Sequence, residues 1–256
     1  MSKIADAFLK PGAFIAYLVA GDPNLSVGAE YILAAQEAGA DLIEIGIPFS
    51  DPIAEGPIIQ EASVRALNAG ARLDKIFEMV LDLKGKVTVP LVFMTYLNPV
   101  FKYGYECFFA KCAEIGVSGI IIPDLPFELQ GEVLPHAHAH GVEVITLVAP
   151  TSSDRLERIA KNAQGFIYLV SSMGVTGVRS EFSSGIRQQV AALRNITDIP
   201  IAIGFGISTP AQAAEFAECA DGVIVGSALV RIIAEHGEHA HEQLKEAISN
   251  MKAAMN

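Results

Sequence analysis

Three carboxylates stand close together in one apolar stretch of the chain, residues 42–57, which has the sequence LIEIGIPFSDPIAEGP. They are Glu44, Asp51 and Glu55. Carboxyl groups serve as general acids and bases, and apolar surroundings raise the pKa of a carboxyl group toward the range that acid catalysis needs. The stretch therefore indicates acid–base chemistry, and the elements around it decide which carboxylate takes part.

Glu44 lies in a run with the alternation of a β-strand. One face of that strand consists of isoleucines, namely Ile43, Ile45 and Ile47. Such a face suits packing against helices, so Glu44 is expected on the other face, with Leu42 and Gly46, in the interior of a sheet or barrel. A buried carboxyl group there fits a general acid better than an arginine-paired structural residue, because few basic residues stand at strand ends.

Asp51 and Glu55 follow in the loop after this strand. An Asx turn with the nearby backbone is the simpler interpretation of Asp51. Glu55 precedes Gly-Pro and an expected helix start, so capping of that helix and catalysis remain equal alternatives for its carboxylate.

Short β-branched runs recur along the chain, and segments with helical spacing lie between them. The runs begin at Ala13, Asp41, Pro90, Gly119, Glu143, Gly165, Ile199 and Asp221, and helical segments include 26–39, 107–116, 153–164 and 210–219. Near-continuous apolar strands are typical of a parallel sheet covered on both faces. Eight such units predict an α/β fold, a (β/α)₈ TIM barrel forming a single domain over residues 1–256. An open doubly wound sheet is the alternative, disfavoured because no GxGxxG follows the first strand.

Composition limits the possible ligands and the compartment. The 256 residues are 51% apolar, enough for a large core, and 18 basic against 29 acidic residues give a net charge of -11. That charge disfavours nucleic acid and anionic lipid as partners. Three cysteines without zinc-site spacing indicate free thiols in a reducing cytoplasm, and Asp6 and Pro11 argue against a signal peptide at the apolar segment 13–21.

Glycine-rich segments at the ends of the last three predicted strands indicate a phosphate site. They are MGVTG (173–177), GFG (204–206) and GS (226–227). Glycine lets the backbone approach a ligand, and a helix N-terminus offers unpaired N–H groups to an anion. This is the usual position of a phosphate in a TIM barrel, and it explains how an acidic chain holds one. The Ser- and Gly-rich loop around Gly177 is expected to close over the substrate.

The positions of the lysines and histidines disfavour a Schiff-base mechanism and a zinc site. Between Lys111 and Lys245 the only lysine is Lys161, on an expected outer helix, so a Schiff-base lysine at the strand ends is not expected. The histidines fall in two groups, His136, His138 and His140, and His236, His239 and His241. Both groups lie in expected helices, where solvated surface histidines are favoured over a zinc site. Acid–base catalysis by carboxylates without a metal remains.

The whole chain resembles the tryptophan synthase alpha subunit family. The matching segments are YLVAGDP (17–23), EIGIPFSDPIAEGP (44–57), MTYLNPVFKYG (94–104), IIPDLP (121–126), GVTG (174–177), GFGIS (204–208) and DGVIVGSA (221–228). The resemblance implies retro-aldol cleavage of indole-3-glycerol phosphate to indole and glyceraldehyde 3-phosphate. It also implies a cytoplasmic αββα complex, in which the beta subunit receives the indole and holds pyridoxal phosphate, and no cofactor in this chain.

The resemblance assigns roles residue by residue. Glu44 matches the acid, which also takes up the proton of the glycerol hydroxyl, and Glu55 matches the second carboxylate, where the family usually has Asp. The matched substrate-binding positions are Tyr17, Ile59, Tyr96, Tyr168 and the lid residue Thr176; the matched phosphate-binding positions are Gly177, Gly206, Gly226 and Ser227. Asp51 matches a contact with the beta subunit. Ser172 stands where many relatives have Arg.

Two alternative functions remain at this stage. Glu55 and Ser172 depart from the family pattern, which leaves open a weakly active barrel that acts mainly as an allosteric activator of the beta subunit. A sugar-phosphate isomerase or epimerase would also fit the barrel and its phosphate site. The apolar and tyrosine-rich positions favour an aromatic substrate over that last alternative.

Overall fold

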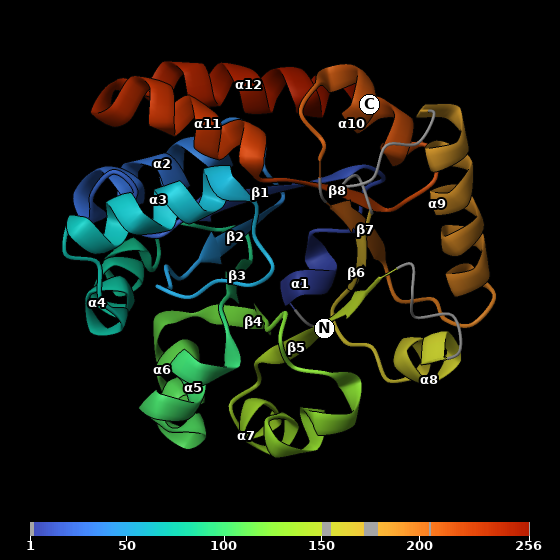
Figure 1. The fold of residues 1–256 in the computed structure, drawn as a ribbon, viewed down its shortest axis with the longest axis horizontal. Helices are drawn as coiled ribbons and strands as arrows, with labels where there is room; N and C mark the ends of the chain where they lie inside the picture. Colours follow the sequence, from blue (N-terminus) through green and yellow to red (C-terminus); the bar gives the residue numbers. More distant parts are fainter. Residues whose placement is uncertain (1–2, 150–154, 172–178, 205, 256) are drawn as a thin grey trace.

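Eight parallel strands close into a barrel in the order of the sequence (Figure 1). The structure is a computed structural model that describes residues 3–149, 155–171, 179–204 and 206–255. The strands are β1 (Ala13–Val19), β2 (Leu42–Gly46), β3 (Leu91–Met94), β4 (Val117–Ile121), β5 (Glu143–Val148), β6 (Ile167–Val170), β7 (Ile201–Gly204) and β8 (Gly222–Val225). Because β1 pairs with both β2 and β8, the sheet has no open edge. The predicted (β/α)₈ TIM barrel is confirmed, and each predicted run contains or overlaps one strand.

Helices surround the barrel, except that the short α1 lies across one end of it (Figure 1). They are α1 (Lys3–Asp6), α2 (Leu25–Glu37), α3 (Pro57–Asn68), α4 (Leu73–Leu83), α5 (Leu97–Tyr103), α6 (Tyr105–Ile115), η1 (Phe127–Glu132), α7 (Leu134–Ala139), α8 (Leu156–Lys161), α9 (Arg179–Arg194), α10 (Pro210–Ala217), α11 (Ser227–His236), η3 (Gly237–His239) and α12 (His241–Ala254). Two α-helices, not one, follow each of β2, β3 and β8. Within the described ranges, no helix is long and apolar enough to cross a membrane.

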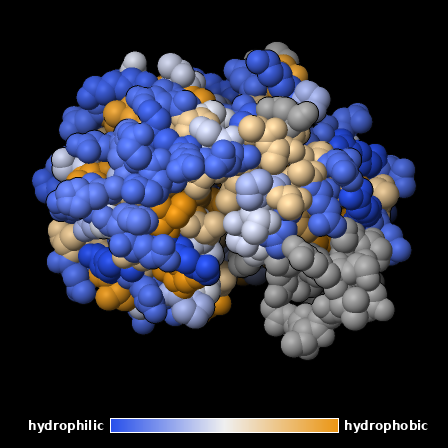
Figure 2. All heavy atoms as spheres, turned by 90° about the horizontal axis from the view of Figure 1, so that it is seen from above, coloured by the Kyte–Doolittle hydropathy of each residue, from blue (hydrophilic) through white to orange (hydrophobic). Residues whose placement is uncertain are grey.

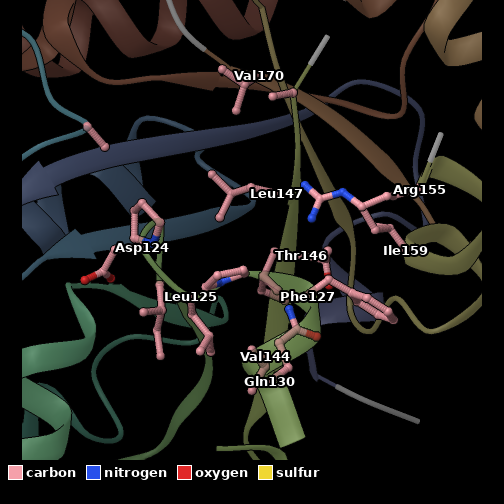
Figure 3. Close-up of a pocket in the computed structure, with 16 residues that line it drawn as sticks. Asp124, Leu125, Phe127, Gln130, Val144, Thr146, Leu147, Arg155, Ile159 and Val170 are labelled. Atoms are coloured by element: carbon pink, nitrogen blue, oxygen red, sulfur yellow. The ribbon is translucent and has the colours of Figure 1, made fainter. Parts of the chain in front are cut away.

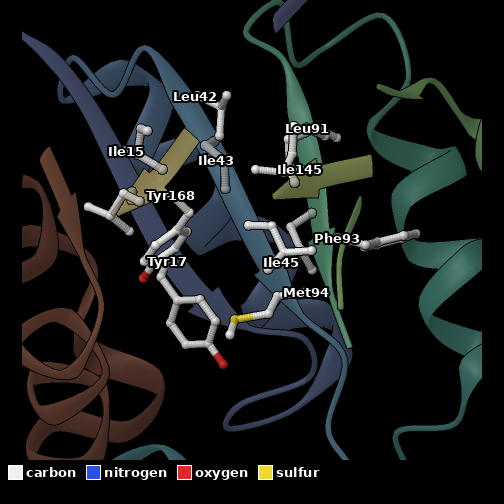
Figure 4. Close-up of a cluster of buried hydrophobic side chains, with 14 of the residues drawn as sticks. Ile15, Tyr17, Leu42, Ile43, Ile45, Leu91, Phe93, Met94, Ile145 and Tyr168 are labelled. Carbon is white, nitrogen blue, oxygen red and sulfur yellow. The ribbon is translucent and has the colours of Figure 1, made fainter. Parts of the chain in front are cut away.

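The side chains of β2 divide as their alternation predicts. Glu44 is in register with Tyr17 of β1 and Val92 of β3. Paired residues of parallel strands point to the same side of the sheet, and Tyr17 and Glu44 line one cavity inside the barrel. The barrel interior and the layer between strands and helices are filled by buried aliphatic and aromatic side chains (Figure 4).

The two ends of the barrel carry different features. At the N-terminal end of the strands, buried Ile4 of α1 packs against Gly119 and Gly165. Lys252 of α12 is fixed there too, with its ammonium 2.7 Å from the Asp41 carboxylate. The residues with candidate chemistry gather at the other end of the barrel, at the C-terminal ends of the strands.

Seen from the side of α12, most of the surface is hydrophilic, with apolar side chains scattered among polar ones (Figure 2).

Candidate active site

A cavity of about 130 Å³ lies at the C-terminal end of the barrel. Its walls are Tyr17, Glu44, Glu55, Gly56, Ile59, Met94, Tyr168, Gly206, Ile224, Gly226 and Ser227. The cavity therefore brings together residues from β1, β2, β3, β6 and β8 and from the loops after β2, β7 and β8. Of the predicted site residues, Tyr96 and Asp51 do not line it, and Thr176 and Gly177 lie outside the described residues, as does Ser172.

Glu44 is buried in the wall of this cavity, with 1% of its surface exposed. Neither carboxyl oxygen has a hydrogen-bond partner among the described residues. Burial away from water, and secondarily the nearby Glu55 carboxylate, raises the pKa of Glu44 to about 8. At neutral pH the group is thus protonated and able to donate a proton, and both of its oxygens remain available to a ligand. The interpretation as an arginine-paired structural residue is wrong.

Glu55 is held by Tyr96. The Tyr96 hydroxyl donates a hydrogen bond to the Glu55 carboxylate, and it accepts hydrogen bonds from the backbone amides of Ile53 at 2.9 Å and Ala54 at 2.8 Å. The alternative of helix capping by the Glu55 side chain is wrong, because α3 starts after Gly56 without a side-chain cap. Burial, followed by the bond to Glu55, raises the pKa of Tyr96 to about 12, so this hydroxyl stays protonated as a donor.

Two buried tyrosines form the wall around Glu44. Figure 4 shows Tyr17 and Tyr168 directed into the same interior space, close to Met94. Burial raises the pKa of both phenols well above the ordinary value, and the neighbouring Glu44 raises it further. Both phenols therefore stay neutral, and they offer hydroxyl groups within an otherwise apolar wall.

Two glycines make room for those phenols, a role that was not predicted for them from the sequence. A methyl group on Gly46 would collide with the Tyr17 hydroxyl, and one on Gly204 would collide with the Tyr168 hydroxyl. The available signal was a glycine at the last position of a strand, β2 or β7, on its inward face. Met94 and Ile224 were missed as well, although they stand at or next to the last position of β3 and β8, where functional residues of a barrel gather.

The first turn of α11 opens onto the cavity. Gly226 is the residue that precedes this helix, Ser227 is its first residue, and no side chain caps its N-terminus. Free N–H groups and the helix dipole at that position favour an anion. Gly206 lines the same cavity with a φ of 75°, a left-handed conformation that glycine adopts without strain. Three of the four predicted phosphate-binding residues therefore line one cavity.

Asp51 lies away from the cavity, exposed on the loop after β2. Its carboxylate accepts a hydrogen bond from the Ser50 hydroxyl. Exposure without a part in the cavity fits a role in contact with another molecule better than a role in the chemistry of the cavity.

A second cavity, of about 540 Å³, adjoins the first beside β4, β5 and β6 (Figure 3). Leu147 and Val170 contribute its apolar wall, and Arg155 at its edge forms an ion pair with Glu128 at 2.9 Å. Ala54 lines this cavity, whereas the next residue, Glu55, lines the smaller one. The loop that Tyr96 holds therefore forms part of the wall of both cavities.

The predicted surface histidines make protein contacts on the outside of the barrel. His136 and His140 both contact the Glu106 carboxylate, at 3.1 and 2.7 Å, and His138 contacts Gln164. Within the part of the chain that the structure describes, no group of three or more His, Cys, Asp or Glu side chains is arranged to hold a metal ion.

The closed barrel and the cavity at its C-terminal end, which is lined by the buried carboxyl group of Glu44, define the chain as a (β/α)₈-barrel enzyme. The family model described as tryptophan synthase alpha chain matches residues 6–256. The tryptophan synthase alpha chain of Lacticaseibacillus casei is 46% identical over 255 residues, covering 100% of this chain and 96% of that one. This chain therefore belongs to the tryptophan synthase alpha chain family.

Solved structures agree with this assignment. The crystal structure of tryptophan synthase subunit alpha from Legionella pneumophila superposes with a TM-score of 0.91 at 34% identity, covering 100% of this chain and 98% of that one. A chain from the tryptophan synthase α₂β₂ complex of Pyrococcus furiosus superposes with a TM-score of 0.89 at 39% identity, covering 95% of this chain and 99% of that one.

Proposed function

We propose that the chain cleaves indole-3-glycerol phosphate to indole and glyceraldehyde 3-phosphate by acid–base catalysis, as the alpha subunit of a tryptophan synthase. The observation that carries this proposal is Glu44, a buried carboxyl group whose unpaired oxygens face a cavity at the mouth of the barrel. An uncapped helix N-terminus in the same cavity supports a phosphorylated substrate.

The proposed reaction begins with proton transfer from Glu44 to carbon 3 of the indole ring. The bond between that carbon and the glycerol chain then breaks, and its electrons return to the positively charged ring. The Glu44 carboxylate takes the proton of the glycerol hydroxyl, whose carbon becomes the aldehyde. Glu44 thus ends protonated, as it began, and a pKa of about 8 suits a group that must give and take a proton near neutral pH.

Glu55 has a separate task in this proposal. Its carboxylate accepts a hydrogen bond from the ring N–H, where positive charge develops when carbon 3 is protonated. Tyr96 orients that carboxylate from behind and does not itself meet the substrate. This changes the role that resemblance alone gives to Tyr96, from substrate binding to positioning.

The other site residues divide between the two ends of the substrate. Tyr17, Ile59, Tyr168 and Met94 supply the apolar surface that an indole ring needs. Gly206, Gly226 and Ser227 hold the phosphate through backbone N–H groups. We assign Gly177 to the same task and the lid residue Thr176 to substrate binding. This chain's own residues supply every group in the scheme, so we propose no cofactor here and assign pyridoxal phosphate to the beta subunit.

We further propose a cytoplasmic αββα complex in which residues 1–256 act as one barrel domain. Exposed apolar side chains on the loops and helices after β2, β3 and β4 support a docking surface for the beta subunit, namely Ile53, Phe101 and Leu129. Exposed Asp51 lies on the first of these loops. Three free cysteines fit a reducing compartment.

The test compares the unaltered chain with the Glu44→Gln variant. Glutamine keeps the size of the side chain but cannot transfer the proton, so indole release should fall by about 10³-fold or more, while binding of glycerol 3-phosphate persists. Unchanged indole release would remove Glu44 from the reaction. An unaltered chain that releases no indole, alone or with the beta subunit, would contradict the proposed activity.

A second function, activation of the beta subunit by a barrel with weak activity of its own, is favoured by the exposed side chains Ile53 and Phe101. Beta-subunit turnover measured with the Glu44→Gln variant separates the two functions. If the Glu44→Gln variant still activates the beta subunit although it releases no indole, docking alone causes the activation.

A further inference from the structure

We infer that the ion pair between Asp22 and Arg65 positions Glu55, and that both residues are positioning residues for the reaction proposed above. Asp22 lies in the loop after β1, and Arg65 lies on α3, the helix that begins just after Glu55. Neither residue lines the cavity. The inference rests on the proposed function only for the kinetic part of its test.

The geometry of the pair is that of a rigid fork. The Arg65 Nε lies 2.9 Å from one carboxylate oxygen of Asp22, and Nη2 lies 2.8 Å from the other. The Asp22 side chain is fully buried, whereas that of Arg65 keeps 34% of its surface exposed. Two parallel hydrogen bonds between planar groups fix direction as well as distance, which a single ammonium contact does not do.

A close backbone approach supports the same attachment. Gly21, which precedes Asp22, has a φ of 82°, and a methyl group on it would lie 2.9 Å from the Cβ of Ala71, just after α3. The C-terminal part of α3 is therefore fixed to the loop after β1 at two neighbouring points.

Helix α3 transmits this attachment to Glu55. The residues Gly56 and Ile59 at the start of the helix line the cavity, and the Gln60 side chain bonds to the Glu55 carbonyl oxygen at 2.8 Å. Arg65 follows Pro57, the first residue of the helix, by eight positions, about 12 Å along the helix axis. A helix of this length behaves as a rigid strut, so rotation or sliding at Arg65 moves the backbone of Glu55 directly. Tyr96 holds the carboxylate end of Glu55, and the ion pair holds its backbone end.

Stability alone is a weak reason for this pair. Removing a carboxylate from water offsets much of the attraction between buried charges, and an apolar pair of equal size is often as stable. A rigid fork next to the helix of a catalytic carboxylate supplies what an apolar pair does not, a defined orientation. A displacement of about 1 Å at a reacting group lowers rates by about a hundredfold.

The experiment uses the full chain with Arg65→Lys, which keeps the charge but loses the fork, and Arg65→Met, which loses both. Lys252→Met is the matched control, because it breaks the ion pair with Asp41 at the other end of the barrel. Steady-state indole release is measured for each variant. We expect both Arg65 variants to lower kcat by about 10- to 100-fold with KM changed less than about threefold, and Lys252→Met to keep kcat.

A readout without catalysis accompanies the kinetics. The Glu44 carboxyl group is titrated by ¹³C NMR in each variant, because the nearby Glu55 carboxylate helps to raise its pKa. Displacement of Glu55 should lower the Glu44 pKa in the Arg65 variants and not in Lys252→Met. If Arg65→Met does not fold, Arg65→Lys carries the test.

The outcomes are separable. Normal kcat and an unchanged Glu44 pKa in Arg65→Lys would overturn the inference, and so would an equal loss of kcat in Lys252→Met. If the unaltered chain released no indole, the proposed function would fail, and the Glu44 titration would still decide the role of Arg65.

Discussion

The hydroxyl of Tyr96 connects the Glu55 carboxylate to the backbone of the loop that carries it. It donates to Glu55 and accepts from the amides of Ile53 and Ala54, so one phenol oxygen fixes three consecutive residues. At position 55 the family usually has Asp, whose side chain is one methylene shorter than that of Glu55. The hydrogen bond therefore gives the longer side chain a defined end point, which a flexible glutamate would lack.

Replacing Tyr96 by phenylalanine should lower kcat of indole release by about tenfold while KM changes little. The ring remains packed, but the Glu55 carboxylate and two amides lose their shared partner, so the carboxylate samples unproductive positions. Steady-state kinetics measure the effect. Tyr105→Phe on α6 is the matched control, since Tyr105 packs against Phe101 and His136 outside the cavity. Equal kinetics for the two variants would contradict a positioning role for Tyr96.

Replacing Glu55 by aspartate should lower the rate of indole release by about tenfold or more, even though aspartate is usual in the family. The shorter side chain ends roughly 1 Å before the position at which the Tyr96 hydroxyl meets the carboxylate here. The combination Glu55→Asp with Tyr96→Phe should then be little slower than Glu55→Asp alone, because the bond is already broken. A faster Glu55→Asp variant would mean that the natural residue limits catalysis and that the site is not adapted to it.

The pH dependence of the reaction should report the state of Glu44. The proton needed by the indole ring is present while Glu44 is protonated, so the rate should stay level toward neutral pH and fall about tenfold per pH unit above pH of about 8. Measuring kcat/KM from about pH 6 to about pH 10 gives this profile. A rate that already falls about tenfold per pH unit from the lowest pH measured would show that burial does not protect the proton of Glu44.

The burial of Glu44 should also make the free energy of unfolding depend on pH. Because the pKa of Glu44 is raised on folding, the folded chain holds a proton that the unfolded chain has released between about pH 4.5 and about pH 8. The free energy of unfolding therefore declines as pH rises through that window. Glu44→Gln removes the dependence, so this variant should match the unaltered chain near the acidic end and exceed it by a few kcal/mol above pH of about 8. Urea unfolding at both ends of the window measures the difference; parallel pH profiles for the two chains would contradict it.

The sequence predicted those features that depend on local periodicity. The eight strands and the inward position of Glu44 follow from apolar runs and from the alternation of Ile43 and Ile45 around it. Contacts between distant residues were not predictable in this way. Tyr96 reaches Glu55 across 41 positions, and Arg65 reaches Asp22 across 43. Contacts over such separations leave no periodic pattern in the sequence, so they could not be predicted from it. The family resemblance assigned Tyr96 to substrate binding and gave no role to Arg65.

Gly46 offers a final test, because its lack of a side chain is what the Tyr17 hydroxyl requires. Its backbone does not need glycine, since it is not among the glycines with a positive φ, so Gly46→Ala acts mainly by collision with the phenol. The added methyl group should destabilise the chain by about 1–3 kcal/mol and displace Tyr17 from its place beside Glu44, lowering indole release by about tenfold.

Tyr17→Phe removes the nearest colliding atom, so combining it with Gly46→Ala should recover part of both losses. Thermal unfolding and indole release of the two single variants and the double variant give the coupling between the positions. Additive effects would show that the two residues do not interact. Recovery only in the double variant would establish that the glycine is kept for the tyrosine and not for the strand.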